Sequence, residues 1–210
     1  MQTKHTKPNS VLDIYLIRHT EVAVGRAICY GSSDVALADN YPKQRDRLRQ
    51  HLPAEAPALI ISSPLTRCRI LASDLAASHA LPPDAILYDD RLREYHFGDW
   101  ENQPWANLDR AALDVWMVDF VHNPPPNGEN FLQVYERVGA FWQEQIVPLT
   151  THEPAHETVY IVAHGGVIRA LLCLFLEVPL QNAYRLSLDY GAVSKLTTNG
   201  QFYTIQFINR

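Results

Sequence analysis

Four short runs of apolar, largely aliphatic residues recur along the chain, and stretches with helical periodicity separate them. The runs are DIYLI (13–17), ALIIS (58–62), AILY (85–88) and VYIVA (159–163). Runs of this length indicate buried strands, and their alternation with helices is typical of a parallel sheet that is covered on both faces. We therefore predict an α/β fold with a mainly parallel sheet and helices on both faces.

Apolar residues at three- and four-residue steps predict the helices of this fold. The predicted ranges are 41–52, 65–78 and 129–146. The apolar segment that begins at Val167 is too short to span a bilayer, so we expect a buried helix there. Near the end, the runs 193–198 and 201–207 flank Asn199-Gly200, a dipeptide that favours a hairpin at the edge of the sheet.

The length of 210 residues and the apolar content of 47% allow one substantial core. We expect a disordered polar tail over residues 1–10 and a single domain over residues 11–210. One long irregular region, 95–130, contains the turn sequence PPPNG. We interpret it as a partly helical lid over the C-terminal ends of the strands, because excursions of this size usually carry function.

Charge and cysteine content exclude several classes of function. The formal net charge is −5 and the chain has no block of Lys or Arg, which argues against a nucleic-acid or anionic-membrane surface. The three cysteines are odd in number and lack metal spacing, which favours reduced thiols and a cytoplasmic location. We expect a small-molecule partner, and a homodimer is compatible with the sequence.

Three of the predicted strands end in polar side chains. Arg18 and His19 follow the first strand, Arg67 lies shortly after the second, and His164 and Gly165 follow the last. Each could be an ordinary polar group at a strand end. Since the C-terminal ends of parallel strands face a common crevice, we expect them to converge instead. Two arginines and two helix N-termini at one point predict a site for a phosphate dianion.

The second of these strand ends also carries a helix start signal. Ser63 is the expected N-cap, Pro64 the expected first helical residue, and Arg67 lies one turn further on. The histidines add a chemistry that arginine lacks. Arginine charges nearby favour a neutral imidazole, and a neutral imidazole nitrogen can attack phosphorus.

Four motifs in this order resemble those of the histidine phosphatase superfamily, which includes cofactor-dependent phosphoglycerate mutases and many phosphatases. They are LIRHTE (16–21), SSPLTRCRILA (62–72), LREYHFGDWE (92–101) and VAHGGVIR (162–169). The resemblance covers most of the chain. It implies a phosphoglycerate mutase-like fold, a phosphomonoester substrate, and neither metal nor cofactor.

The resemblance also assigns roles to individual residues. His19 would be the nucleophile that becomes phosphohistidine, and Arg18, Arg67 and His164 would hold the phosphoryl oxygens. Glu94 would be the general acid, which protonates the leaving oxygen and then activates water. The residues alone do not choose Glu94, since other carboxylates lie nearby; these are Asp89, Asp90 and Asp99.

The chain departs from the family pattern at three positions. Thr20 stands where most members have Gly, Gly25 where many have an Asn that touches the phosphate, and Ala163 where Ser is usual. None of these changes removes a core catalytic group. The change at Gly25 indicates a subgroup of the family.

The lid and the stretch CYGSSD (29–34) suggest which subgroup. The lid has one arginine, Arg110, and many carboxylates, so we expect it to repel a bisphosphate and disfavour a mutase. These carboxylates are Asp99, Glu101, Asp109, Asp114, Asp119 and Glu129. The lid is also rich in aromatic residues, which pack as a core or bind substrate. We take Gly165, Tyr30 and Trp100 as substrate-binding candidates.

The stretch 29–34 resembles α-ribazole phosphatases, enzymes of cobalamin nucleotide-loop assembly, whose substrate carries a flat benzimidazole. This resemblance implies hydrolysis of α-ribazole 5′-phosphate. A broad-specificity phosphatase, a phosphoglycerate mutase-like enzyme and a non-catalytic protein that binds a phosphorylated ligand are the alternatives.

The sequence HEPAH (152–156) matches the HExxH pattern of zinc proteases. That pattern needs both histidines on one face of a helix, and Pro154 lies inside the helix that would be required. We therefore expect no zinc site.

Overall fold

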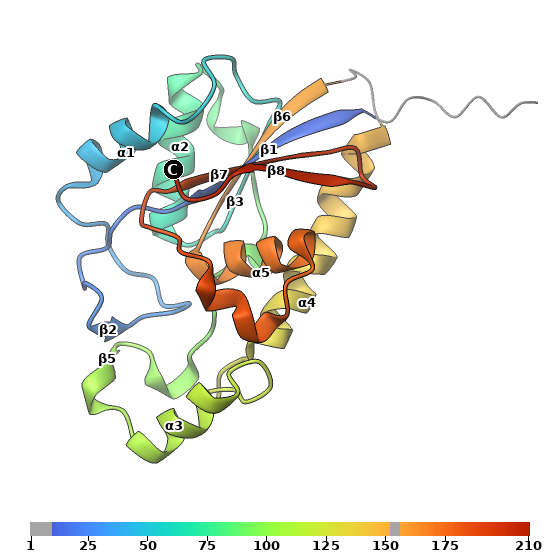
Figure 1. The fold of residues 1–210 in the computed structure, drawn as a ribbon. Coiled ribbons are helices and arrows are strands. Elements are labelled where there is room, and N and C mark those ends of the chain that lie inside the picture. Colours follow the sequence, from blue (N-terminus) through green and yellow to red (C-terminus); the bar gives the residue numbers. More distant parts are fainter. Residues whose placement is uncertain (1–9, 152–155) are drawn as a thin grey trace, which may run out of the picture.

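The fold is described from a computed structural model, for residues 10–151 and 156–210. A six-stranded sheet forms its centre (Figure 1). From one edge to the other, the strands are β4 (Ile86–Tyr88), β3 (Leu59–Ser62), β6 (His156–Ala163), β1 (Val11–Arg18), β7 (Val193–Thr198) and β8 (Tyr203–Phe207). The strands β4, β3, β6 and β1 are parallel, and the hairpin β7–β8 is antiparallel. The predicted parallel sheet with an edge hairpin is confirmed.

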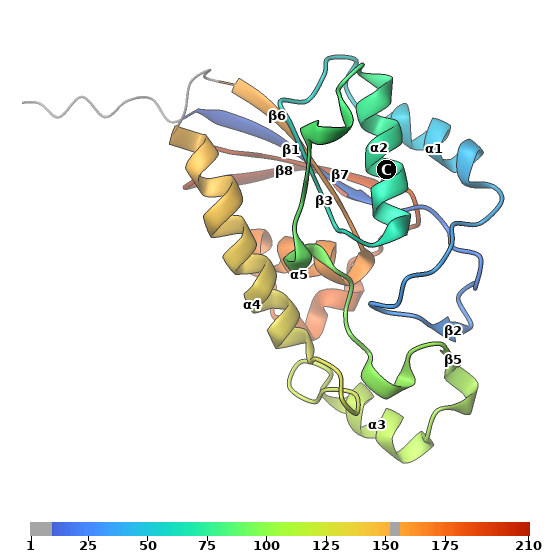
Figure 2. The ribbon, with the colours of Figure 1, turned by 180° about the vertical axis from the view of Figure 1, so that it is seen from behind.

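Helices cover both faces of the sheet (Figures 1 and 2). They are α1 (Tyr41–Arg49) and α2 (Thr66–Ser78) on one face, and α4 (Phe131–Phe141) and α5 (Gly165–Leu176) on the other. Alternation along β1 sends Ile14 and Leu16 into the core beneath α4 and α5, and Tyr15 and Ile17 into the core beneath α2. The predicted two-faced architecture is therefore confirmed.

Helix α2 begins one residue after the start of the predicted range 65–78 and two residues after the position that the cap signal at Ser63 and Pro64 indicates. Its N-cap is Leu65, so Ser63 and Pro64 lie before the helix. The cap comes from a distant residue instead, because the carboxylate of Asp34 accepts hydrogen bonds from the backbone N–H and the hydroxyl of Thr66, at 2.9 and 2.6 Å. Arg67 consequently lies in the first turn of α2, where its side chain reaches back to the strand ends.

The remaining short elements lie mainly in the lid and the connections. They are β2 (Ile28–Cys29), β5 (Gln103–Pro104), α3 (Arg110–Val118), a π-helical turn (Trp142–Ile146) and 3₁₀ turns at Pro83–Ala85, Asp90–Leu92, Gly98–Trp100, Trp105–Asn107, Val147–Thr151 and Leu180–Arg185. The lid, with α3 and β5, extends past the C-terminal ends of the strands, and β5 pairs with β2 (Figure 1). A partly helical lid is thus present where it was predicted.

The carboxylates of the lid serve the lid's own structure. Asp109 caps α3 through the N–H of Ala112, and Arg110 pairs with Asp114. Glu101 accepts hydrogen bonds from the N–H groups of Ser32 and Phe97, at 2.9 and 3.0 Å. These carboxylates keep their negative charge while they form caps, turns and ion pairs, so the expectation that the lid repels a bisphosphate stays a prediction.

The described chain begins at Ser10, which is buried and donates its backbone N–H to the carbonyl of Thr150. The rest of the predicted tail, 1–9, lies outside the described residues, as do 152–155 of the HEPAH match; His156 opens strand β6. None of the helices in the described ranges is long and apolar enough to cross a membrane. All three cysteines are free and buried.

Candidate active site

The strand ends named by the sequence do meet. The parallel register of β1 and β6 sets Arg18 opposite Ala163, so the residues that follow, His19 and His164, leave the sheet side by side. Their rings lie 5.1 Å apart between centroids, at an angle of 62°. Ser62 of β3 lies opposite Val162 of β6, which brings the start of α2 to the same place. The predicted convergence is therefore observed.

Hydrogen bonding fixes the tautomer of His19. The side chain is fully buried, and its Nδ1 lies 2.7 Å from the carbonyl oxygen of Thr20. A carbonyl oxygen only accepts, so Nδ1 carries the proton and Nε2 keeps its lone pair. Within the described part of the chain Nε2 has no hydrogen-bond partner. The ring thus presents an unprotonated nitrogen, as a nucleophile requires.

Burial is the main reason that both histidines stay neutral. Loss of solvent lowers the pKa of His19 well below its usual value, and the charges of Arg67 and Arg18 lower it further. Burial likewise lowers the pKa of His164, followed by the charges of Arg67, His19 and Arg18. The sequence pointed to the arginines alone, because burial of the ring could not be judged from local pattern.

The ring of His164 contacts Arg67, Ser63 and Cys68, whose Sγ lies 3.5 Å from Nε2. Its Nδ1 lies 3.2 Å from Nε of Arg67, which can only donate, so Nδ1 is the acceptor. The other nitrogen, Nε2, therefore carries the proton and donates to Oγ of Ser63 at 2.7 Å. Ser63, predicted as a helix cap, instead orients this imidazole.

The two predicted arginines both reach the site. Arg67 is fully buried and donates to the carbonyls of Gly31 and Ser33, at 2.7 and 2.8 Å, as well as to His164. These bonds use three of its five N–H donors. Arg18 donates to the carbonyl of Leu188, while its buried Nε has no partner among the residues described. Two guanidinium groups with unused donors therefore lie close enough for their charges to act on His19, which suits a phosphoryl group.

The carboxylate of Glu94 sits at the start of α5. It accepts from the backbone N–H of Gly166, at 3.1 Å to Oε1 and 3.2 Å to Oε2, and from the N–H of Tyr95 at 3.0 Å. A Cβ on Gly166 would lie only 2.5 Å from Oε1 of Glu94. A Cβ on Gly165 would lie 3.2 Å from Cζ of Arg18. The glycine pair thus gives both side chains room against the helix end.

The other carboxylates that could have been the acid are engaged elsewhere. Asp89 pairs with Arg91 and Asp90 with Arg93, each at 2.7 Å. Asp99 accepts from the side chain of Asn127 at 2.9 Å. Glu94 is the one of the four that lies at the helix N-terminus beside the histidines.

A cavity of about 180 Å³ opens next to Glu94. Its lining consists of Arg26, Ile28, Tyr30, Gly31, Glu94, Phe97, Trp105 and Tyr190. The hydroxyls of Tyr30 and Tyr190 lie 2.8 Å apart, and Cζ of Arg18 lies 4.0 Å from the centre of the Tyr190 ring. The cavity is therefore mainly aromatic, with Arg26 as its cation.

Tyr30 lies at this cavity, as expected, but Trp100 does not. Trp100 is 5% exposed and packs with Cys29 and Leu108 in the core of the lid, its ring 5.8 Å from that of Trp116. Trp105 takes the place expected for Trp100. The lid has no strong periodicity, so the sequence could not tell which aromatic residue faces inward.

The three departures from the family pattern have different surroundings. Thr20 is buried, and its carbonyl holds His19. Gly25 has a φ of +70°, and no atom lies within 4 Å of the Cβ it lacks. Ala163 is buried in the core, and its carbonyl accepts the N–H of His19. No group of His, Cys, Asp and Glu within 10–151 and 156–210 has an arrangement suited to a metal ion.

The buried neutral histidines predict how stability depends on pH. Unfolding exposes both rings, which then take up protons below a pH of about 6.5, whereas the folded rings do not because their pKa is lowered. The free energy of unfolding should therefore fall with pH below that value. Each histidine contributes a slope of about 1.4 kcal/mol per pH unit. His19→Gln should remove one such slope in denaturant titrations between pH 4.5 and 7; equal slopes for both proteins would contradict the assignment.

Comparisons with known proteins agree with this geometry. The sequence profile of the histidine phosphatase superfamily (branch 1) matches residues 14–210. The adenosylcobalamin/alpha-ribazole phosphatase of Escherichia coli (strain K12) is 26% identical over 93% of this chain and 95% of its own length. The glucosyl-3-phosphoglycerate phosphatase of Mycolicibacterium vanbaalenii is 31% identical over 80% of this chain and 76% of its own.

A solved structure gives the same result for the fold. The crystal structure of the alpha-ribazole phosphatase from Shigella flexneri superposes with a TM-score of 0.82 at 25% identity, over 94% of this chain and 96% of that one. The profile match covers nearly the whole chain, from the first strand to the last residue. The chain, which brings two buried histidines and two arginines together at the strand ends, belongs to the histidine phosphatase superfamily and is a phosphoric monoester hydrolase.

Proposed function

We propose that the protein hydrolyses phosphomonoesters through a phosphohistidine formed on Nε2 of His19. The observation that carries this proposal is the buried ring of His19, whose Nδ1–H is bound to the carbonyl of Thr20 and whose Nε2 is free. The fixed tautomer means that no proton has to leave the ring before attack.

The first half of the reaction transfers the phosphoryl group to the protein. The substrate phosphate lies against the unused N–H donors of Arg18 and Arg67, which offset the charge on its oxygens. The lone pair of Nε2 forms the N–P bond while the P–O ester bond breaks. A protonated Glu94 gives its proton to the leaving oxygen, so an alcohol departs rather than an alkoxide.

The second half returns the protein to its starting state. The carboxylate of Glu94 takes a proton from water, and the water oxygen attacks phosphorus. The N–P bond breaks, its electron pair returns to Nε2 of His19, and inorganic phosphate is released. Glu94 is then protonated again, ready for the next cycle.

We take α-ribazole 5′-phosphate as the first candidate substrate. The cavity beside Glu94 is lined by four aromatic rings, of Tyr30, Phe97, Trp105 and Tyr190, which suit a flat leaving group. Relatives with this activity in their names support the choice. The stretch 29–34 supports it less directly, because its residues have structural partners: the carbonyls of Gly31 and Ser33 bind Arg67, and Asp34 caps α2.

Arg26 favours a second candidate. Its exposed guanidinium lines the same cavity, with Cζ 5.3 Å from the centre of the Tyr190 ring. A cation at this position suits a leaving group that carries a carboxylate, as a phosphoglycerate derivative does. One relative is a glucosyl-3-phosphoglycerate phosphatase. A broad-specificity phosphatase would use neither feature strongly.

Replacing Glu94 by Gln should harm poor leaving groups most. An alkyl phosphate needs a proton on its leaving oxygen, whereas the leaving oxygen of p-nitrophenyl phosphate does not. We expect kcat/KM to fall about 100-fold or more for the alkyl ester, and much less for the aryl ester. Parallel steady-state assays of both substrates measure this ratio. Equal losses would assign Glu94 a structural role only.

Arg26→Gln should separate the two candidate substrates. If α-ribazole 5′-phosphate is preferred, its kcat/KM exceeds that of 3-phosphoglycerate and glucosyl-3-phosphoglycerate by orders of magnitude, and the variant changes it by less than about threefold. A carboxylate bound to Arg26 would instead lose about 10- to 100-fold. Arg49→Gln, on the exposed surface of α1, is the matched control. A flat profile across all esters would favour broad specificity and contradict both candidates.

A further inference from the structure

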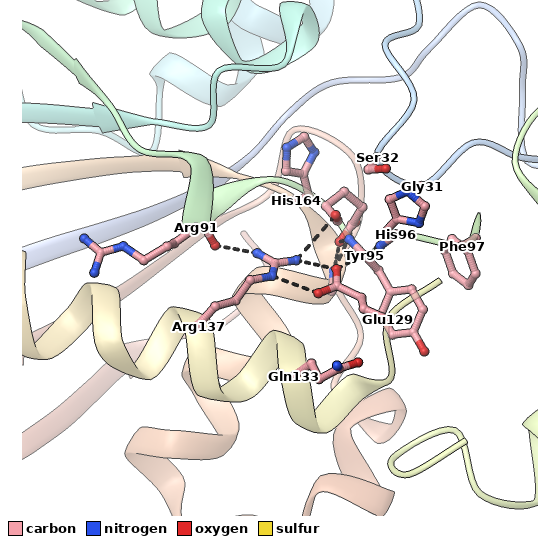
Figure 3. A network of polar contacts seen from close by, with 12 residues as sticks. Gly31, Ser32, Arg91, Tyr95, His96, Phe97, Glu129, Gln133, Arg137 and His164 are labelled. Carbon is pink, nitrogen blue, oxygen red and sulfur yellow. Dashed lines mark hydrogen bonds and ion pairs between the residues drawn. The ribbon is translucent and has the colours of Figure 1, made fainter. Parts of the chain in front are cut away.

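The general acid lies on irregular backbone that a side chain of α4 holds in place. Between the 3₁₀ turns Asp90–Leu92 and Gly98–Trp100, the chain has no helix or strand to bind its peptide groups. Arg137 of α4 supplies part of what is missing. It donates to the carbonyl of Arg91 (Figure 3). It also donates, at 3.4 Å, to the carbonyl of Glu94 itself.

Glu129 completes this arrangement from the end of the lid. Its carboxylate binds the guanidinium of Arg137 through two contacts, at 2.8 Å to Nη2 and 3.1 Å to Nε (Figure 3). The same carboxylate accepts the N–H of His96 at 2.9 Å, and the N–H of Glu129 donates to the carbonyl of His96 at 2.9 Å. The backbone is therefore held on both sides of Glu94.

The two ends of Glu94 are thus fixed by two helices that share one core. Arg137 on α4 binds its carbonyl, while Gly166 of α5 binds its carboxylate. A capping box between Asn130 and Gln133 fixes the start of α4 and so the position of Arg137. The side chains of Arg137 and Glu129 are 21% and 19% exposed, so solvent screens their pairing less than that of a surface pair.

We propose that Arg137 and Glu129 are positioning residues for the general acid: they hold the backbone of Glu94 so that its carboxylate stays between the N-terminus of α5 and the cavity. The inference rests on the proposed role of Glu94. Neither residue lines the aromatic cavity that holds Tyr30, Trp105 and Tyr190 and is proposed for the leaving group. Both instead border a separate pocket of about 470 Å³ that Glu94 also lines. Their effect on turnover runs through the placement of one carboxyl group.

This role predicts a leaving-group signature, which is a larger loss of kcat/KM for an alkyl phosphate than for an aryl phosphate. Residues outside the aromatic cavity should show it. Displacement of a catalytic group by about 1 Å can lower a rate by about 100-fold. Arg137→Gln and Glu129→Gln should therefore each lower kcat/KM for an alkyl phosphate about tenfold or more, and for p-nitrophenyl phosphate less than about threefold. Only the alkyl phosphate needs a proton donated to its leaving oxygen.

A second ion pair provides the matched control. Lys195 and Asp13 pair at 2.8 Å with exposed fractions of 21% and 16%, on strands β7 and β1. Lys195→Gln should lower the stability measured by thermal unfolding to a similar extent. It should change kcat/KM for both substrates by the same factor. The double variant Glu94→Gln/Arg137→Gln should discriminate between the two esters no more than Glu94→Gln alone, because both changes act on one group.

The outcomes separate this inference from the proposed function. If Glu94→Gln shows the leaving-group signature and Arg137→Gln lowers kcat/KM equally for both substrates, the positioning role is overturned and the proposed function stands. Additive effects in the double variant would overturn it as well. If Glu94→Gln itself shows no signature, the role of Glu94 fails and the inference fails with it.

Discussion

The full burial of a charged guanidinium, that of Arg67, is the constraint on which the rest of the site depends. A buried charge is very unfavourable unless polar groups surround it. Here the partners are the carbonyls of Gly31 and Ser33 and Nδ1 of His164, none of which is a carboxylate. The positive charge is therefore hydrogen-bonded without being neutralised. A phosphate dianion can supply the missing countercharge.

Several local structures follow from this need. The loop 29–34 folds over Arg67 so that the carbonyls of Gly31 and Ser33 point at its guanidinium. Glu101 holds the same loop to the lid through Ser32. Asp34, at the end of the loop, caps α2 and so places Arg67 in the first helical turn. The bond from Arg67 sets the tautomer of His164, whose Nε2–H then donates to the hydroxyl of Ser63. The conformation of the loop 29–34 and the position of the phosphate-binding guanidinium therefore depend on each other.

The sequence predicted the features that depend on periodicity and on strand ends. Short local patterns are enough to predict the parallel sheet, the hairpin and the convergence of His19, Arg67 and His164, because each strand and turn is marked by its own residues. The cap of α2 was predicted wrongly at Ser63, because Asp34, which lies 32 positions before the capped residue Thr66, provides it. Local pattern cannot reveal a partner that arrives through tertiary structure.

The lid and the cavity escaped prediction for a related reason. Trp100 and Trp105 differ by five positions in an irregular segment, and only the packing of the lid decides that the first is buried and the second faces the cavity. Arg26 and Tyr190 lie in connections without any repeating pattern. Glu94 was found through the family resemblance, since its place depends on the backbone N–H of Gly166 in α5 as well as on the N–H of Tyr95.

The central claim is that the fold has prepared one particular nitrogen, Nε2 of His19, for attack on phosphorus. The phosphoenzyme can be trapped by rapid quenching into alkaline denaturant, and NMR of the digested peptide identifies the phosphorylated ring nitrogen. The account predicts a phosphoryl group on Nε2 of His19, absent from His19→Gln. A phosphoryl group on Nδ1, or on any other residue, would contradict it.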